Sequence, residues 1–359
     1  MSTLDETMDR LLDLPREAGS PAAAEARALV ADHLRGLRYR VEEQPFSFRP
    51  SSLNAFPVFG AGLGGLGLLL LPLLTSARLP GWSALLLWVT GLTALVLGAV
   101  GIGLGWLPLG GATREDANLI ATRGDVPIRR WIVAHLDTKA QAQSMAGRLA
   151  AVWVIGIAVL LLTSLAVLRC WVAVPLPLAT GGAFTAVLAG ALAGRGRLRG
   201  TSPGARDNGS GLAAALTAAE LGQDPTTGIL ITGAEEFGLV GARVFVSVAA
   251  SRLEGAGVVN LDTIDQEGRL YLVSHDARGR RLAVAEAGKL ISVGPPLRVR
   301  RLPLGILVDS LPFARAGVPA VTIGRLTWDT LRRIHTPGDT REGLSLATAK
   351  RVGQALVAN

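Results

Sequence analysis

Apolar residues are concentrated in two long blocks that interrupt an otherwise mixed sequence. The first block runs from about Ala55 to Leu107 and is divided by a turn at residues 76–81; the second runs from about Ala151 to Ala193 and is divided near residues 169–177. Each half approaches the ~20 apolar residues that a helix needs to cross a bilayer core. The alternative, a helix pair buried in a large soluble core, disagrees with the near absence of charged residues from each half. The pattern therefore predicts two helical hairpins with four transmembrane helices.

Outside these blocks the chain alternates between helical and strand-like spacing. Apolar residues recur at helical intervals from Glu25 to Leu37, and the segment Arg40 to Phe48 alternates like a strand. Short apolar runs then recur between helical stretches, at residues 130–134, 228–232, 257–261 and 318–323. Strands that alternate with helices favour an α/β fold with a doubly wound, largely parallel sheet and helices on both faces.

Removing both hairpins leaves about 250 residues, a size that one α/β domain accommodates. We therefore expect a single α/β domain with two inserted hairpins. Residues 1–54, 108–147 and 195–359 belong to the α/β domain, while residues 55–107 and 148–194 form the hairpins.

Composition and charge agree with a membrane protein. The chain is 49% hydrophobic with a mean hydropathy of +0.40, which is too apolar for an ordinary soluble protein of this length. Its net charge of +8 does not reside in a compact basic tract with interleaved aromatic residues, so nucleic acid is not an expected partner. Several arginines instead gather beside the apolar blocks, a placement that suits a lipid bilayer.

The basic residues that flank the hairpins also predict an orientation. On the side of the α/β domain the flanking segments carry Arg38, Arg40, Arg49, Arg114, Arg123, Lys139, Arg148, Arg195, Arg197 and Arg199. The two opposite turns carry only Arg78 and Arg169. Because positive charge is retained on the cytoplasmic side, the α/β domain is expected to face the cytoplasm.

Side chains that can bind metal follow three of the apolar runs, and two glycine-containing loops supply more. These residues are His135, Asp137, Glu235, Glu236 and Asp262 at the ends of the runs, and Asp207 and His335 in the loops. Open α/β sheets place their sites outside the carboxyl ends of the strands. Taken singly each signal has an ordinary explanation, such as a turn, a helix cap or a solvated face. Together, nitrogen and carboxylate ligands in this mixture suit zinc or a similar divalent ion.

The order of these pieces resembles peptidase family M28, the metallo-aminopeptidases. The matching motifs are AHLDT, PGARDNGSG, AEEFGLVGAR, NLDTID, DSLPFARAGVPA and IHTPGDT. The segment from Arg16 to Phe46 also resembles the family's opening helix and strand. The resemblance covers most of the chain outside the hairpins and fills every metal-ligand position.

The resemblance implies a site with two divalent metal ions, most suitably zinc, bridged by Asp207. One ion would also bind His135 and Asp262, and the other Glu236 and His335. Asp137 would orient His135, and Glu235 would act as the general base. Two cations about 3.5–4 Å apart lower the pKa of a bridging water and polarise a scissile carbonyl.

The implied function is that of a membrane-bound aminopeptidase, a hydrolase acting on peptide substrates. A single-zinc glutaminyl cyclase or an acyl-amide hydrolase has a similar constellation and remains an alternative. An inactive membrane scaffold is a further alternative, although no ligand is lost.

Two departures from the family pattern, Asp265 and Ser310, are expected to alter the substrate pocket. His33 is expected at the surface and His275 in a turn, and neither receives a role.

Overall fold

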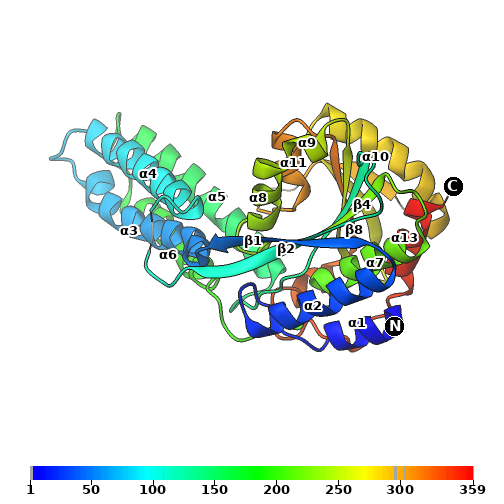
Figure 1. The fold of residues 1–359 in the computed structure, drawn as a ribbon. Coiled ribbons are helices and arrows are strands. Elements are labelled where there is room, and N and C mark those ends of the chain that lie inside the picture. The colour runs from blue at the N-terminus through cyan, green and yellow to red at the C-terminus, as the bar shows by residue number, and fades with distance from the viewer. Residues whose placement is uncertain (1–2, 108, 295–296, 303–304, 359) are drawn as a thin grey trace. The chain divides into compact units, whose positions relative to one another are not determined.

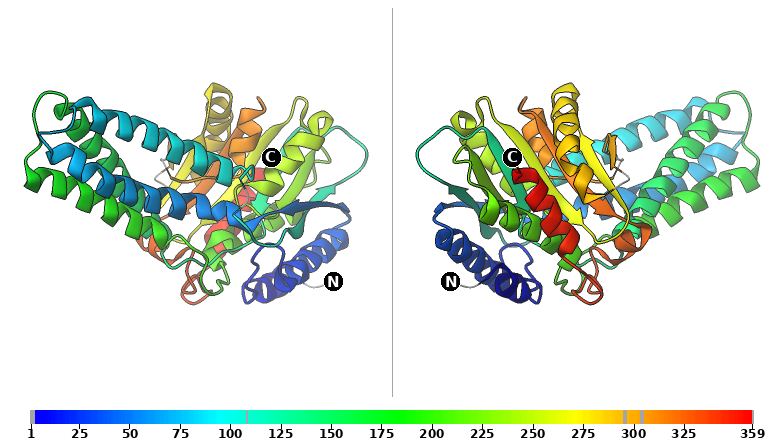
Figure 2. Two further views of the ribbon diagram at one scale, coloured as in Figure 1. Left: turned by 90° about the vertical axis from the view of Figure 1, so that its left-hand side faces the viewer. Right: turned by 90° about the vertical axis from the view of Figure 1, so that its right-hand side faces the viewer.

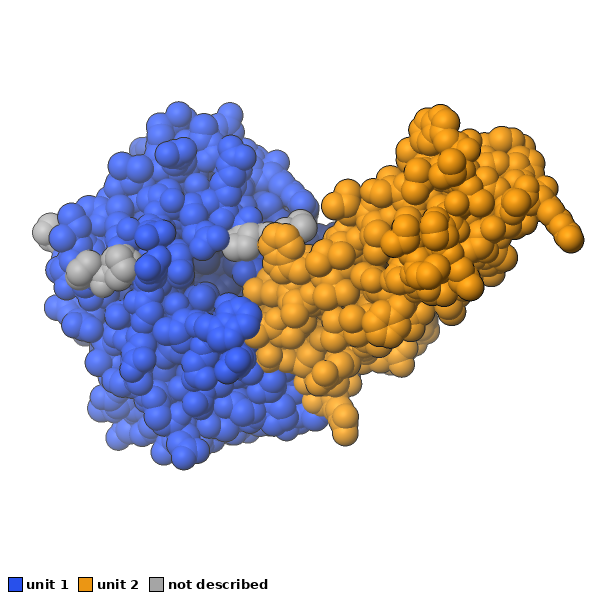
Figure 3. Space-filling view, turned by 180° about the vertical axis from the view of Figure 1, so that it is seen from behind, with its two compact units in different colours: residues 1–48, 113–140, 200–359 blue, residues 49–112, 141–199 orange. Residues whose placement is uncertain are grey.

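The computed structural model describes residues 3–107, 109–294, 297–302 and 305–358. The chain forms two compact units, which Figure 3 shows in two colours. The sheet unit comprises Met1–Phe48, Thr113–Ala140 and Gly200–Asn359, and the helical unit comprises Arg49–Ala112 and Gln141–Arg199. Each unit is thus assembled from segments that are far apart in the sequence.

One eight-stranded sheet forms the centre of the sheet unit (Figures 1 and 2). The strand order is β1-β2-β4-β3-β5-β8-β6-β7, and the neighbours β4, β3, β5 and β8 are parallel to one another. Strand β2 pairs antiparallel with both β1 and β4, and β6 pairs antiparallel with β8 and parallel with β7. The strands are β1 (Arg40–Phe48), β2 (Arg114–Thr122), β3 (Arg130–His135), β4 (Thr227–Thr232), β5 (Gly257–Ile264), β6 (Arg269–Ser274), β7 (Leu297–Arg300) and β8 (Ala320–Leu326).

Helices cover both faces of this sheet. Successive side chains of a strand point to opposite faces, so each strand contributes apolar side chains to the packing on both sides. In β3, Ile132 and Ala134 join one buried cluster, whereas Trp131 and Val133 join another. The first cluster includes side chains of α1 (Leu4–Leu11), α2 (Pro21–Gly36), α7 (Gly211–Leu221), α10 (Ala277–Leu290) and α13 (Ala347–Val357). The second includes side chains of α8 (Val240–Val248), α9 (Ala250–Leu253) and α11 (Ser310–Arg315). The predicted doubly wound, largely parallel fold is therefore confirmed.

The end of strand β5 differs from the predicted end of the apolar run at residues 257–261, and this difference affects the candidate site. Strand β5 continues to Ile264, so Asp262 lies within the strand and not directly after it. The pairing with β8 is irregular between Leu261 and Ile264, and Thr263 has a left-handed φ of 54°. This local irregularity interrupts the alternation of the strand beside Asp262.

Four long helices form the helical unit: α3 (Ala55–Thr75), α4 (Trp82–Gly103), α5 (Met145–Leu168) and α6 (Leu176–Gly194). Each is long and apolar enough to cross a membrane, as the two apolar blocks predict. The short 3-10 turn η1 (Pro50–Asn54) precedes α3. The indole of Trp88 donates a hydrogen bond of 2.9 Å to the hydroxyl of Thr163, which joins α4 to α5.

Glycines allow α3 and α6 to approach closely. A Cβ atom added to Gly60 would lie 2.3 Å from the Cβ of Ala193, and one added to Gly190 would lie 2.6 Å from the carbonyl oxygen of Gly60. Neither contact leaves room for a larger side chain. Small residues at such crossings are typical of helices that pack inside a membrane.

Candidate metal centre

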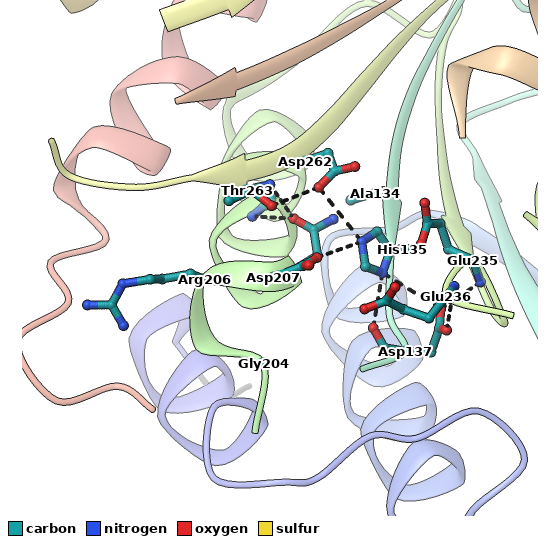
Figure 4. Close-up of polar contacts among 12 residues, drawn as sticks. Ala134, His135, Asp137, Gly204, Arg206, Asp207, Glu235, Glu236, Asp262 and Thr263 are labelled. Carbon is teal, nitrogen blue, oxygen red and sulfur yellow. Dashed lines mark hydrogen bonds and ion pairs between the residues drawn. The ribbon is translucent and has the colours of Figure 1, made fainter. Parts of the chain in front are cut away.

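The predicted ligands lie together at one end of the parallel strands of the sheet unit. Figure 4 shows four of them, His135, Asp207, Glu236 and Asp262. His135 is the last residue of β3, and Glu235 and Glu236 follow β4 after a short turn. Asp262 comes from β5, on the other side of β3. Because β4, β3 and β5 are parallel neighbours, their carboxyl ends meet at one edge.

Two loops complete the cluster. Asp207 lies in a short irregular helical turn, η2 (Ala205–Ser210), directly before α7. His335 follows the short helix α12 (Trp328–Arg333) and adopts a left-handed φ of 64°. All five candidate ligands are at least largely buried, with Asp262 the most exposed of them.

The five side chains form two groups that share Asp207. One group is His135, Asp207 and Asp262; the other is Asp207, Glu236 and His335. The two carboxylate oxygens of Asp207 are used separately, since Oδ1 lies 3.2 Å from Nε2 of His135 and Oδ2 lies 3.1 Å from Nε2 of His335. Within each group the candidate ligand atoms lie within 4.8 Å of one another. This arrangement can hold two cations with Asp207 between them.

Asp137 organises the site through both its backbone and its side chain. Its carbonyl oxygen lies 3.0 Å from Nδ1 of His135, so that the Nε2 atom faces the ligand cluster. Its carboxylate accepts hydrogen bonds from the backbone N–H groups of Glu235 at 2.9 Å and Glu236 at 3.1 Å. The imidazole is thus oriented mainly by a carbonyl group, while the Asp137 carboxylate holds the turn that carries the two glutamates.

A second buried carboxylate holds the Asp207 loop. Asp339 accepts hydrogen bonds of 3.0 Å from the backbone N–H groups of both Arg206 and Asp207. Burial raises the pKa of Asp339 to about 6, although these two hydrogen bonds oppose the shift. Asp339 belongs to the IHTPGDT motif, yet its role depends on a contact with a distant loop.

Crowding of buried carboxylates alters their protonation. Burial raises the pKa of Glu235 well above its ordinary value, and the charges of Glu236 and Asp309 add to the effect although His135 opposes it. Burial likewise raises the pKa of Asp309 to about 7. For Asp207, burial is outweighed by hydrogen bonds from His135 and His335, which bring its pKa below its ordinary value. Negative charge is therefore in excess at the centre of the site.

The donor set fits divalent cations. Buried Oε1 of Glu236 has no hydrogen-bond partner in the described part of the chain, although it lies 3.3 Å from Nε2 of His335. Burial lowers the pKa of His135, but the charge of Glu235 and the hydrogen bonds to Asp137 and Asp207 raise it well above its ordinary value. A cation between these ligands would offset the excess charge and give the free carboxylate oxygen a partner.

Sequence patterns missed several residues that support the centre. Lys139 donates to Glu236, and Arg16 donates to the backbone carbonyls of both Leu136 and Gly204. Lys139 comes directly after the AHLDT motif, and this position is the only sequence feature that could have indicated a role for it in the site. Buried arginines such as Arg16 have no sequence signal, because the carbonyl groups that they bind come from separate segments.

The two departures from the family pattern have structural partners. The carboxylate of Asp265 accepts hydrogen bonds from Arg206 at 3.3 Å and from the hydroxyl of Thr330 at 2.7 Å. Ser310 shares hydrogen bonds with Thr322 at 2.6 Å and with His275 at 2.8 Å. Asp265 therefore belongs to a buried network that fixes the residue before Asp207.

His33 lies away from the centre, and the expectation of a surface position is wrong. It is 3% exposed, and its Nδ1 atom lies 3.3 Å from the hydroxyl of Thr7. The residue sits on α2, whose side chains pack against α1 and the sheet, so the helical pattern was compatible with burial.

Comparisons with known proteins agree with this geometry. The model of the family described as "Peptidase family M28" matches residues 194–359. No curated protein sequence matches the chain.

Solved structures share the fold at low sequence identity. An aminopeptidase from Aneurinibacillus sp. strain AM-1 superposes with a TM-score of 0.57 at 16% identity, over 98% of this chain and 92% of that chain. A zinc aminopeptidase from Bacillus subtilis gives 0.57 at 15% identity, over 99% and 94%. A glutaminyl cyclase from Fimbriiglobus ruber gives 0.59 at 16% identity, over 99% and 92%. These similarities establish the fold, which aminopeptidases and cyclases have in common.

Proposed function

Because residues 194–359 match the model of peptidase family M28, we propose that the chain is a membrane-bound aminopeptidase of this family that releases N-terminal residues from peptides and uses two divalent ions, most suitably zinc. The main support for this proposal is the position of the Asp207 carboxylate, whose two oxygens point to two different histidines. Such a carboxylate suits a bridge between two ions and offsets part of their mutual repulsion.

Each residue of the centre has a task in the proposed reaction. When bound, the cations would polarise the scissile carbonyl and lower the pKa of the attacking water. Glu235 takes up the proton of that water and delivers it to the departing amine. Its buried position favours proton uptake, since burial raises its pKa. Asp137 keeps Glu235 in place through its hydrogen bond to the backbone N–H group.

Two substitutions separate proton transfer from metal binding. Glu235→Gln preserves side-chain size and is expected to keep the fold and the metal content while kcat falls by about 10²–10⁴-fold. Asp207→Ala is expected to lose metal, because both ligand groups contain this residue. The exposed Glu254 provides a matched control, and Glu254→Gln should behave as wild type. Wild-type turnover by Glu235→Gln would remove the proposed mechanism.

A glutaminyl cyclase is the second candidate, because a cyclase has the same fold. The presence of two complete groups, His135 with Asp207 and Asp262 and Asp207 with Glu236 and His335, favours the two-metal peptidase over a single-zinc enzyme. Metal analysis and products distinguish the two activities. A peptidase releases the first residue from peptides with a free N-terminus and discriminates against N-acetylated peptides, whereas a cyclase converts N-terminal glutamine without shortening the chain.

We further propose that the four long helices span a membrane. Large apolar side chains face outward on all four helices: Leu69 is 63% exposed, Leu97 65%, Trp153 74%, Leu160 70% and Phe184 69%. A water-soluble helical unit rarely leaves so much apolar surface uncovered. The protein should therefore remain with membranes during carbonate extraction at high pH, and release into the soluble fraction would contradict the proposal.

The arginine distribution supports a cytoplasmic position for the sheet unit. Of the two arginines in the opposite turns, Arg169 is buried and donates to the carbonyl groups of Leu73, Ser76 and Leu79. It therefore caps a helix end within the unit, which leaves Arg78 as the exposed basic residue of those turns. A C-terminal reporter that is active only in the cytoplasm should report activity, whereas activity only outside would reverse the orientation.

A further inference from the structure

Lys139 places a positive charge inside the candidate metal centre. It lies four residues after His135, and its Nζ atom donates a hydrogen bond of 2.6 Å to Oε2 of Glu236. Both side chains are buried, with exposed fractions of 5% and 4%. Solvent therefore screens this ion pair only weakly.

The ammonium group makes the two oxygens of Glu236 unequal. Oε2 is held by Lys139, while Oε1 lies 3.3 Å from Nε2 of His335 and lacks a hydrogen-bond partner among the described residues. Lys139 thus fixes the carboxylate in an orientation that directs one oxygen toward Asp207 and His335. A carboxylate whose charge is partly compensated by a neighbouring ammonium group attracts a cation less strongly than a carboxylate without that partner.

The positive charge of Lys139 also weakens cation binding at Glu236. Any cation held by Oε1 of Glu236 is within a few ångströms of the ammonium group, because Oε1 and Oε2 belong to one carboxylate. Like charges at such separations repel appreciably even at an effective dielectric constant of ~20. Among the described residues, no lysine or arginine forms an ion pair within 4 Å of His135, Asp207 or Asp262, and the charge of Arg16 acts at longer range on Asp207, which both groups share.

The two histidines provide a second, independent asymmetry. Nδ1 of His135 is hydrogen-bonded to the carbonyl oxygen of Asp137 at 3.0 Å. Nδ1 of His335 is buried and has no partner within the described residues. An acceptor at the second ring nitrogen fixes the ring and increases the basicity of the ligating nitrogen. His135 is therefore the better prepared ligand.

From these contacts we infer that Lys139 is a positioning residue that makes the two metal positions unequal. The position formed by His135, Asp207 and Asp262 binds its ion tightly and fills first. The position formed by Asp207, Glu236 and His335 binds its ion weakly and fills second. This inference rests on the proposed two-metal function and adds an order of loading that depends on one lysine.

Zinc titration of the metal-free, detergent-solubilised full chain tests this order directly. With a competing chelator, wild-type protein should show two binding classes. Lys139→Met removes the charge at similar side-chain size and should tighten the weaker class by about 10–100-fold, because the repulsion between the ammonium group and the cation is lost. Lys139→Arg keeps the charge and should leave the weaker class weak. Lys289→Met removes a partly exposed lysine of α10 and should titrate as wild type.

Ligand variants identify the two classes. Asp262→Asn should abolish the tight class, and His335→Gln should abolish the weak class. Two equal classes in wild-type protein, or weaker zinc binding by folded Lys139→Met, would overturn the role assigned to Lys139 and leave the two-metal proposal intact. Failure of wild-type protein to bind zinc at all would instead refute the proposed function on which the inference rests. Circular dichroism of each variant establishes that the fold is retained.

Discussion

Arg16 connects the segments that carry the candidate ligands, and replacing it provides a stringent test of the site. The side chain is completely buried and donates to five backbone carbonyl groups. Leu136, one of the acceptors, lies between His135 and Asp137, and Gly204 lies three residues before Asp207. Two further acceptors, Leu11 and Leu14, belong to the end of α1 and the loop after it, and Pro203 precedes Gly204.

The expected loss follows from these contacts. Arg16→Met leaves the carbonyl groups buried without their donor, at a cost of about 1–3 kcal/mol for each group that stays unpaired. Removal of the buried guanidinium recovers part of this, since burial also penalises the charge and lowers the pKa of Arg16 to about 10. Disruption of a buried charged network costs about 3–5 kcal/mol in net terms. At about 2–4 °C per kcal/mol for a unit of this size, Tm should fall by about 6–20 °C.

Thermal unfolding in detergent and metal content provide the assay. Arg16→Met should lower both Tm and zinc content, because the two ligand-bearing segments lose their common donor. Arg16→Lys keeps the charge but offers its donors from a single atom, so an intermediate loss is expected. Arg10→Met is the control. Arg10 is exposed and forms a surface ion pair with Glu25 at 3.9 Å, a kind of contact that contributes little to stability. The effect of this substitution should remain within about 0.5 kcal/mol. A Tm within about 2 °C of wild type for Arg16→Met, with full metal content, would refute the reasoning.

Three further predictions concern both units. Gly190→Leu should destabilise the helical unit in detergent, because a Cβ there would meet the carbonyl of Gly60 at 2.6 Å, whereas Gly65→Leu meets nothing within 4 Å and should be tolerated. Arg169→Met should lower the thermal stability of the helical unit by about 2–4 kcal/mol through loss of its buried hydrogen bonds to three carbonyl groups, and an unchanged unfolding curve would contradict this. Burial lowers the pKa of His33 below 6.5, so the neutral imidazole is favoured in the folded protein. The stability that depends on the neutral form is present above pH 6.5 and is lost as pH falls through the lowered pKa. His33→Leu should therefore reduce this acid-dependent loss of stability in denaturant titrations.

Features that depend on local pattern were predictable from the amino-acid sequence alone. The two apolar blocks predicted the four long helices, because length and apolar composition are sufficient to recognise a segment that can cross a bilayer. Alternating strands and helices predicted the doubly wound sheet. The seven residues proposed for the site could be named because strand-end motifs and their order are properties of the chain. Their assignment as ligands and general base remains a prediction for metal analysis and kinetics.

Contacts between segments that are distant in the sequence became visible only in the folded chain. Lys139 meets Glu236 only because β3 and β4 are parallel neighbours, and Arg16 reaches Gly204 only because the fold brings the segment after α1 beside the loop before Asp207. The burial of His33 likewise required the position of α1 over α2. Periodicity and motifs report the neighbours of a residue along the chain, whereas buried charges are stabilised by partners that only the folded chain brings within hydrogen-bonding distance.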